Sequence, residues 1–540
     1  MDSAPDPLRQ LVAPIEQILA SGGDTRLILD PATRLNGYGC RPFPRPEAFT
    51  FASSTATSIS GRAYAAAAAA RQALLRDSMT GGFDRAFAKH MTGLRDQLKD
   101  LLGLADSGCE IVFSPSGTDS QLHATFVARA LLGTPLVSVI AAADETGSGT
   151  VFAASGRHFN AATAQGVAVA KGEKIAGMAE GIECVTVAAR DERGALRPHE
   201  EIDAAIADAV ARSLAAKQRV LLFAMDSSKL GLRAPSIDYL RGLAAASDDG
   251  VQIVIDACQA RLGRTRLRWY LEQGFMVLLT GSKFFTGAPF SGALLLPPAL
   301  AARCARLDRV PPGLRDYTNR EEWPDALAGL RGAFPQRANL GAWLRWVSAI
   351  EEMRDYFAVP LSFRELALRQ FAEIVPQLIA AESRVEALPL DDPAGEGDDE
   401  EMAVRTIFPF IVKRNGRALS QAQAATLYHA LNDDVSPLLP AKLPPMQRLL
   451  AARRCHIGQP VALPDGQGGM KGALRVSAGA RVVSESWCED LDAARAKLRR
   501  EFDQVRAIFE KIHLLVRHFD DIEPAYAPSR AAAPYRVSAA

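Results

Sequence analysis

Three short segments carry side chains that could do chemistry together. The first is a Ser-Gly-Thr turn at 116–118, which follows the apolar run IVFSP and precedes a helical pattern. The second is Asp256, which ends the apolar run VQIVID, and the third is Lys283, which lies between two apolar runs. A helix N-terminus binds anions, a carboxylate can hold a protonated ring nitrogen, and a desolvated amine attacks an aldehyde. These are the parts needed to hold pyridoxal phosphate.

Each segment also has a simpler interpretation. Ser116 could do no more than cap a helix, Asp256 could cap a neighbouring helix or bind a metal, and Lys283 could extend along the surface into solvent. The spacing favours the chemical interpretation, because the 27 residues from Asp256 to Lys283 suffice for the strand, helix and strand of one βαβ unit. No His/Asp cluster lies near Asp256, so no metal site is predicted.

Short β-branched runs alternate with alanine-rich helical stretches between residues 111 and 297. Strands are expected at Glu110–Phe113, Pro135–Ala141, Ile182–Ala188, Arg219–Met225, Val251–Asp256, Phe275–Thr280 and Gly292–Leu296, and helices at Ser120–Leu132, Glu200–Ala216 and Ser236–Ala246. Nearly continuous apolar strands are typical of a parallel sheet with helices on both faces. The pattern therefore predicts an α/β, doubly wound, mainly parallel seven-stranded sheet. In such sheets the ligand lies at the carboxyl ends of the strands, where Gly117, Asp256 and Lys283 fall.

The rest of the chain divides into an arm and a second domain. We predict an N-terminal arm at 1–50, a cofactor-binding large domain at 51–320 and a smaller α+β C-terminal domain at 321–540. Proline and aromatic residues at 35–49 indicate that the arm packs on the body or on a partner subunit. In the small domain, strands are expected at 404–412 and 473–483 and a helix at 487–518. The acidic segment DDPAGEGDDEEM (391–402) is expected to be a solvated loop.

Bulk properties exclude several classes of partner. The 540 residues include 62 basic and 62 acidic ones, and zero formal charge argues against nucleic acid and membrane surfaces. Seven cysteines without CxxC spacing indicate reduced thiols and a cytoplasmic protein. The N-terminus lacks the layout of a signal peptide, and no run reaches the roughly 18 consecutive apolar residues of a membrane span.

The motifs resemble those of the fold-type-I pyridoxal-phosphate enzymes. More narrowly, they are similar to the aminotransferase class V branch, which includes cysteine desulfurases, selenocysteine lyase and kynureninase. DACQ (256–259) is similar to the branch's D-A-x-Q, and TGSK (280–283) to its S-x-H-K. HIGQPV (456–461) resembles H-C-A-Q-P-L, and LRVSAG (474–479) resembles the closing R-x-S segment. The resemblance extends over roughly 110–485.

The resemblance implies a role for each matching residue. Lys283 would form the internal aldimine and move the α-proton, and Asp256 would pair with the pyridine nitrogen. Arg475 would clamp the substrate carboxylate. A surface ion pair is the simpler interpretation of Arg475, and Arg34 or Arg41 of the arm are alternatives for the clamp. The other cofactor contacts would be Ser116, Gly117, Thr118, Thr146, Gln259, Thr280 and Ser282, with Gln259 on the ring hydroxyl. The resemblance also implies a homodimer.

The chain departs from the branch at informative positions. Thr146 stands where a histidine usually covers the ring face, so either Thr146 suffices or His123 or His158 supplies that contact. Ile457 stands where desulfurases carry the sulfur-accepting cysteine. Cys455 is two residues away and could substitute, but a buried inert thiol is the favoured interpretation. These departures argue against a sulfur-mobilising desulfurase.

The predicted function is a pyridoxal-phosphate enzyme acting on the amino group and α-carbon of an amino acid substrate. Transamination is favoured because it needs no additional catalytic group. The alternative is a lyase that expels a leaving group by elimination, such as a C–S lyase without the usual cysteine. A non-catalytic protein of this fold is less favoured, because Lys283, Asp256 and Arg475 are all present and no basic helix-turn-helix is evident.

Overall fold

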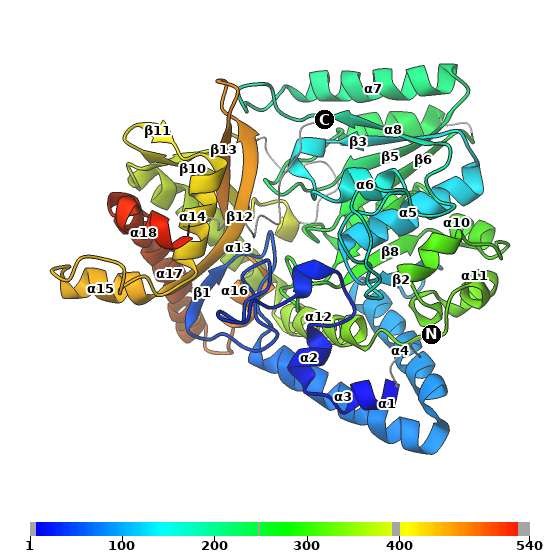
Figure 1. Ribbon diagram of the computed structural model, residues 1–540, viewed down its shortest axis with the longest axis horizontal. Helices are drawn as coiled ribbons and strands as arrows, with labels where there is room; N and C mark the ends of the chain where they lie inside the picture. Colours follow the sequence, from blue (N-terminus) through cyan, green and yellow to red (C-terminus); the bar gives the residue numbers. More distant parts are fainter. Residues whose placement is uncertain (1–6, 247–248, 391–399, 527–540) are drawn as a thin grey trace.

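The computed structural model describes residues 7–246, 249–390 and 400–526. Two β-sheets lie side by side, with the N-terminal arm between and below them (Figure 1). Residues 391–399 of the predicted acidic loop lie outside the described residues, and Glu400–Met402 forms a short 3-10 turn. None of the described helices is long and apolar enough to cross a membrane.

The larger sheet has seven strands in the order β2-β8-β7-β6-β5-β3-β4. Its strands are β2 (Glu110–Ser114), β3 (Leu136–Ala141), β4 (Ile182–Val187), β5 (Arg219–Met225), β6 (Val251–Ala257), β7 (Met276–Thr280) and β8 (Gly292–Leu296). Only β8 runs antiparallel to its neighbours, β2 and β7. Each strand matches the sequence-based expectation to within one residue at either end, and the predicted doubly wound, mainly parallel sheet is confirmed.

Helices cover both faces of this sheet. Alternate strand residues belong to different core clusters: Leu278 packs toward α5, whereas Val277 and Leu279 pack on the opposite face. One face carries α5 (Gly117–Leu132), α6 (Thr150–Ala154) and α10 (Pro298–Cys304), and the other carries α7 (His199–Ala215), α8 (Ile237–Ala246) and α9 (Arg264–Glu272). This double cover explains why most of the strands are nearly continuous apolar runs, whereas the edge strand β4 carries Glu183 and Thr186 and is only partly buried.

The smaller sheet has the order β1-β12-β13-β10-β11, with β9 also paired to β10. Its strands are β1 (Ala48–Phe51), β9 (Val385–Ala387), β10 (Ile407–Arg414), β11 (Arg417–Ala418), β12 (Arg454–Pro464) and β13 (Met470–Ser477). Its helices are α13 (Leu361–Ala381), α14 (Gln421–Leu431), α15 (Pro445–Ala452), α16 (Ala480–Ser484), α17 (Leu491–Arg517) and α18 (Phe519–Tyr526). Most of these elements fall within the smaller α+β domain predicted at 321–540, but β1 begins in the predicted arm.

One predicted strand of this unit is too long. The strand expected at 473–483 ends at Ser477, and α16 begins at Ala480. The chain turns here because the Ala480 N–H donates to the Phe284 carbonyl at 2.6 Å. A Cβ on Gly479 would lie 2.5 Å from Thr286 Cγ2, so the turn packs directly on the segment that follows β7.

The arm packs on the chain's own second sheet. β1 pairs in parallel with β12, and the Tyr428 hydroxyl donates to the Tyr38 carbonyl at 2.8 Å. Arg45 Nη2 donates to the Asn432 carbonyl at 2.8 Å. The arm also holds α1 (Pro7–Leu11), α2 (Ile15–Leu19) and the 3-10 turn η1 (Thr25–Leu27), and it leads into α3 (Gly61–Gly81) and α4 (Phe83–Leu101), which pack with α12 (Leu340–Ala358).

Candidate active site

The three predicted motifs meet at one edge of the seven-stranded sheet. Asp256 lies near the end of β6, Lys283 lies three residues beyond the end of β7, and Gly117 opens α5 after β2. A Cβ on Gly117 would lie 2.8 Å from Cys258 Sγ and 3.2 Å from Thr280 Cγ2. The N-terminus of α5 therefore approaches the ends of β6 and β7 so closely that a methyl group would not fit.

The Asp256 carboxylate is buried and held by two donors. Its Oδ2 accepts from Gln121 Nε2 at 2.8 Å, and its Oδ1 accepts from the Cys258 N–H at 3.1 Å. Gln121 was not predicted as a site residue. It lies four residues after Gly117 on α5, and this spacing places both residues on the same helix face, which is the signal that sequence reasoning could have used.

Lys283 presents an unengaged amine. Its side chain is partly buried, and its Nζ forms no hydrogen bond or ion pair with any residue that the structure describes. The backbone around it is fixed: the Thr286 N–H donates to the Lys283 carbonyl at 2.8 Å. A Cβ on Gly281 would lie 2.3 Å from Ala349 Cβ, so α12 supports this loop from behind. Ser282, in the same loop, is buried.

Backbone strain gathers around these residues. Ala260, Thr286 and Phe290 have φ values of 54°, 58° and 72°, a left-handed conformation that is unfavourable for residues with a Cβ. Ala260 follows Gln259, and Thr286 lies three residues after Lys283. Such strain persists where packing enforces it and is concentrated at ligand sites.

The arm places a cation at the N-terminus of α5. Arg26 Nη2 lies 3.4 Å from Ser116 Oγ and pairs with Asp24 at 2.5 Å. Ser116 caps the helix, because its hydroxyl accepts from the Asp119 N–H at 3.3 Å and donates to the Asp119 carboxylate. This cap starts α5 three residues earlier than predicted. Burial and the nearby Asp24 carboxylate raise the pKa of Asp119 to about 7.

The residues predicted to bind the phosphate differ in whether their hydrogen-bond donors are free. The Thr280 hydroxyl donates to the Cys258 carbonyl at 2.6 Å, so its proton is directed at the protein. The Thr118 side chain lies close to Gly149, where a Cβ would be 2.8 Å from Thr118 Cγ2. The first N–H groups of a helix have no partner within it, so the backbone of Gly117 and Thr118 offers the donors that an anion needs.

A single residue, Ser54, connects Gln259 with Arg475. Gln259 Nε2 donates to the Ser54 carbonyl at 3.0 Å, and its Oε1 is buried without a partner among the described residues. Arg475 Nε donates to Ser54 Oγ at 3.2 Å, Nη2 donates to Thr55 Oγ1 at 2.8 Å, and Nη1 donates to the Gln459 carbonyl. Arg475 is 1% exposed, so the surface interpretation is wrong, and burial lowers its pKa to about 10. All three acceptors are neutral.

The three residues considered for the face of the cofactor ring, Thr146, His123 and His158, contact other parts of the protein. The Thr146 hydroxyl donates to a carbonyl of its own turn at 3.0 Å. His123 is buried, its ring centroid is 5.5 Å from that of Trp323, and burial lowers its pKa to about 3. His158 Nδ1 is hydrogen-bonded to the Tyr317 hydroxyl at 2.6 Å. The two histidines are therefore engaged in packing and hydrogen bonds of their own.

Cys455 has the environment of an inert thiol. It is fully buried in β12, and burial raises the pKa of its thiol to about 11. Ile457 is buried in the same strand. Of the alternative carboxylate-binding residues, Arg41 Nη1 pairs with Glu47 at 3.3 Å and Arg34 is exposed in the arm.

A second lysine at this edge was missed by sequence reasoning. Lys229 lies four residues beyond the end of β5, and its N–H donates to the Glu145 carbonyl at 3.2 Å. Burial, together with the nearby charges of Arg475 and Lys283, lowers the pKa of its ammonium to about 7. The signal available in the sequence was its position, because Lys283 follows its own strand at a similar distance.

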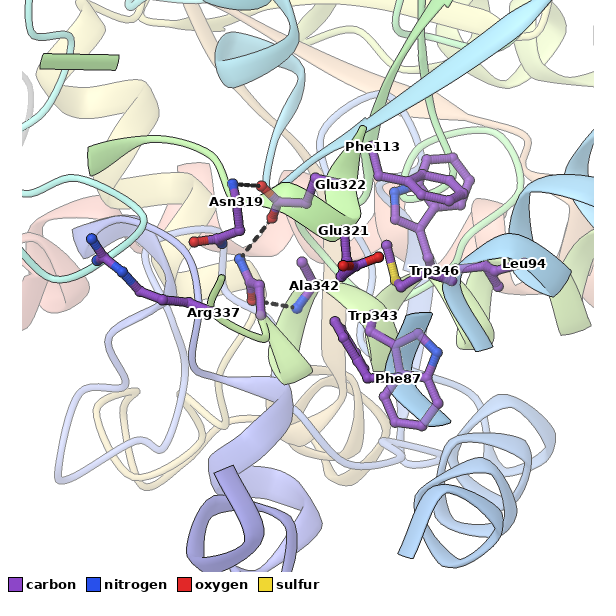
Figure 2. A pocket seen from close by; sticks show the side chains of 12 residues that line it. Phe87, Leu94, Phe113, Asn319, Glu321, Glu322, Arg337, Ala342, Trp343 and Trp346 are labelled. Atoms are coloured by element: carbon purple, nitrogen blue, oxygen red, sulfur yellow. Dashed lines mark hydrogen bonds between the residues drawn. The ribbon is translucent and has the colours of Figure 1, made fainter. Parts of the chain in front are cut away.

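The cavity in Figure 2 is a different feature. It has a volume of about 10 Å³ and is lined mainly by α4, α12 and the turn at Asn319–Glu322. The Glu322 carboxylate accepts from the Thr318 hydroxyl at 2.8 Å and from the Asn319 N–H at 2.7 Å, so its role is to hold that turn. A space of this size holds one water molecule at most, and none of the candidate site residues lines it.

Comparison with known proteins finds similar folds among solved structures. No family model matches the chain, and no curated protein matches its sequence. Among solved structures, a C-DES lysine mutant with glycine covalently linked to its PLP cofactor matches with a TM-score of 0.50 and 11% identity, over 85% of this chain and 97% of that one. Cysteine desulfurase CsdA from Escherichia coli matches with a TM-score of 0.47 and 12% identity, over 85% and 95%. Mouse CSAD matches with a TM-score of 0.47 and 14% identity, over 84% and 83%. The match to the C-DES structure shows that the chain shares the fold of that protein.

Proposed function

We propose that the protein is a pyridoxal-phosphate-dependent enzyme that acts on the amino group and α-carbon of an amino acid. One observation carries the proposal: the unengaged amine of Lys283, the doubly held carboxylate of Asp256 and the open N-terminus of α5 share one edge of the sheet. Such a combination is needed to hold an aldehyde, a pyridine nitrogen and a phosphate at once.

The residues present fit this cofactor. Gly117 lacks the Cβ that would collide with Cys258, so its N–H can approach a phosphate. Gln259 Oε1 is a buried acceptor without a partner among the described residues, as the ring hydroxyl requires. Arg26, which is paired with Asp24, brings a guanidinium to 3.4 Å from Ser116 Oγ at the same helix end. When bound, the cofactor supplies an electron sink for negative charge at the substrate α-carbon.

The chain's own residues would orient the reacting groups. Asp256 holds the ring nitrogen in its protonated form, and Gln121 and the Cys258 N–H fix the direction of that carboxylate. Lys283 moves the proton at the α-carbon. Arg475 donates to the substrate carboxylate, for which its planar guanidinium is well suited.

Transamination is the reaction we favour, because it requires no group beyond these. Sulfur transfer to a thiol of the chain is disfavoured by the burial and raised pKa of Cys455 and by Ile457 in the cysteine position. Cys258, at the site itself, is also buried, and its pKa is raised well above the ordinary value, first by burial. Elimination of a leaving group without a cysteine is the second candidate. A homodimer remains our prediction from the resemblance, and sedimentation velocity tests it.

Absorbance spectroscopy tests the proposal. The purified protein, reconstituted with pyridoxal phosphate, should show a band near the visible edge that is lost in Lys283→Ala and kept in Lys442→Ala, an exposed control lysine. Conversion to a pyridoxamine-like spectrum by an amino acid would favour transamination, whereas an unchanged band with release of pyruvate, sulfide or ammonia would favour elimination. A wild-type protein that cannot be reconstituted would refute the proposal and favour a non-catalytic protein.

A further inference from the structure

The candidate site contains more positive charge than its own acids balance. Lys229 lies beyond β5, Lys283 lies beyond β7, and Arg475 lies on β13. Of the acids near them, Asp256 has both oxygens already hydrogen-bonded, and Glu145 is paired with Arg190. The Arg475 guanidinium donates to hydroxyl and carbonyl oxygens only. Clustered cations without counterions are costly, so the site is suited to bound anions.

The proposed reaction accounts for all of these cations except one. The cofactor phosphate would bind at the N-terminus of α5, next to Arg26, and Lys283 would react with the cofactor aldehyde. The substrate α-carboxylate takes Arg475. Lys229 then has no anion, and among the residues that the structure describes its ammonium has no hydrogen bond or ion pair.

The turn that carries Lys229 is rigid. Ser228 Oγ accepts from the N–H groups of Leu230, Gly231 and Leu232 at 3.1, 3.1 and 3.0 Å. The same hydroxyl donates to the buried Glu145 carboxylate, whose other oxygen accepts from Arg190 Nε at 2.6 Å. The backbone of Lys229 is therefore fixed, while its partly buried side chain remains accessible. Fixed supports of this kind are expected for a binding residue.

We propose that Lys229 binds a second acidic group, on the side chain of the substrate. This inference rests on the proposed function and narrows it: the substrate class is α-amino acids with an acidic side chain, such as aspartate or glutamate. Burial, and then repulsion from Arg475 and Lys283, lowers the pKa of Lys229, and a bound anion would act against both causes. The enzyme would then select its substrate by pairing Arg475 with the α-carboxylate and Lys229 with the acidic group of the side chain.

Substrate preference is the first test. For wild type and Lys229→Met, kcat/KM is measured with aspartate, glutamate, asparagine and glutamine. Loss of one charge-assisted contact should lower the acid-to-amide ratio of kcat/KM by about 10- to 100-fold, and Lys229→Arg should restore part of it. Lys442→Met is the matched control, because Lys442 is exposed and precedes α15 by three residues. Figure 1 shows α15 away from the large sheet. An unchanged ratio, or a wild type that prefers amides, would overturn the inference.

Binding of unreactive acids is the second test and separates the two proposals. Isothermal titration calorimetry measures the Kd of succinate, glutarate and butyrate for wild type and both Lys229 variants. We expect a dicarboxylate to bind wild type about tenfold or more tightly than butyrate, and Lys229→Met to remove that difference. Equal binding of dicarboxylate and butyrate to wild type would refute the role of Lys229, even if the absorbance band is present. If the band is absent, the calorimetry still decides whether Lys229 binds an acid.

Discussion

Substituting Gly117 by alanine should destabilise both the fold and the cofactor site. The added Cβ would lie 2.8 Å from Cys258 Sγ and 3.2 Å from Thr280 Cγ2, and carbon atoms in ordinary contact are about 3.5–4.0 Å apart. The helix must therefore move by several tenths of an ångström from the strand ends. Overpacking of this kind costs about 1–3 kcal/mol.

Two measurements should report this cost. Urea denaturation of Gly117→Ala should give a free energy of unfolding lower by about 1–3 kcal/mol. Because the displaced N–H groups are those proposed to bind the phosphate, the Kd for pyridoxal phosphate should rise about tenfold, which corresponds to about 1.4 kcal/mol. Gly242→Ala is the matched control: Gly242 is in α8 with open space where its Cβ would be, so alanine there should stabilise the protein by up to about 1 kcal/mol.

A double mutant identifies the colliding atom. Cys258→Ala removes the sulfur and leaves Cys258 Cβ, which lies 3.7 Å from the new methyl group, an ordinary contact. Gly117→Ala combined with Cys258→Ala should therefore lose less stability than the two single changes together, with a coupling of about 1–2 kcal/mol. If Gly117→Ala matched wild type in stability and in cofactor affinity, the close approach of α5 to the strand ends would be refuted.

Two further predictions concern charges at the site. Asp256→Asn should lower kcat by about 100-fold or more, because loss of one fixed electrostatic contact to the reacting group has an effect of that order, and cofactor content measured by absorbance should distinguish this from loss of binding. Lys229, which faces Arg475, Lys283, Arg26 and Asp256, has a pKa of about 7 and is therefore mostly neutral at pH 8. Since a bound anion raises that pKa, succinate should bind with uptake of nearly one proton at pH 8 and almost none at pH 6. Calorimetry in two buffers of different ionisation enthalpy measures this proton uptake. Equal uptake at both pH values would contradict the assignment of Lys229.

The larger sheet could be predicted from sequence because six of its seven strands are largely buried; the exception is the edge strand β4. The apolar runs of those six strands are nearly continuous, so their limits are visible in the sequence. The start of α5 was placed late because the capping role of Ser116 was treated as an alternative to anion binding, whereas one turn serves both. The strand before α16 was placed too long because its end is set by contacts with Phe284 and Thr286, which are distant in sequence.

Gln259 and Arg475 were predicted as site residues, but their partners Ser54 and Thr55 were missed because these contacts join distant segments. The Ser54 carbonyl accepts from Gln259 across 205 positions, and the Thr55 hydroxyl accepts from Arg475 across 420 positions. Periodicity and motif spacing describe neighbours along the chain, so they cannot indicate such pairs. Lys229 was missed for a related reason. Its turn matches no motif, and only the folded chain brings it near the charges of Arg475 and Lys283, which is what marks it as a site residue.

Two anchored cations also bear on which reaction occurs. With the proposed cofactor bound, the orientation in which the chain's residues hold the substrate would decide which bond at the α-carbon breaks. Arg475 is fixed by Ser54 and Thr55, and Lys229 is fixed by a turn bonded to Glu145. An acidic substrate held at both ends cannot rotate freely about its α-carbon, whereas an amide held only at Arg475 can. Lys229→Met should therefore change the ratio of products formed from aspartate as well as the rate, and an unchanged product ratio would limit Lys229 to affinity alone.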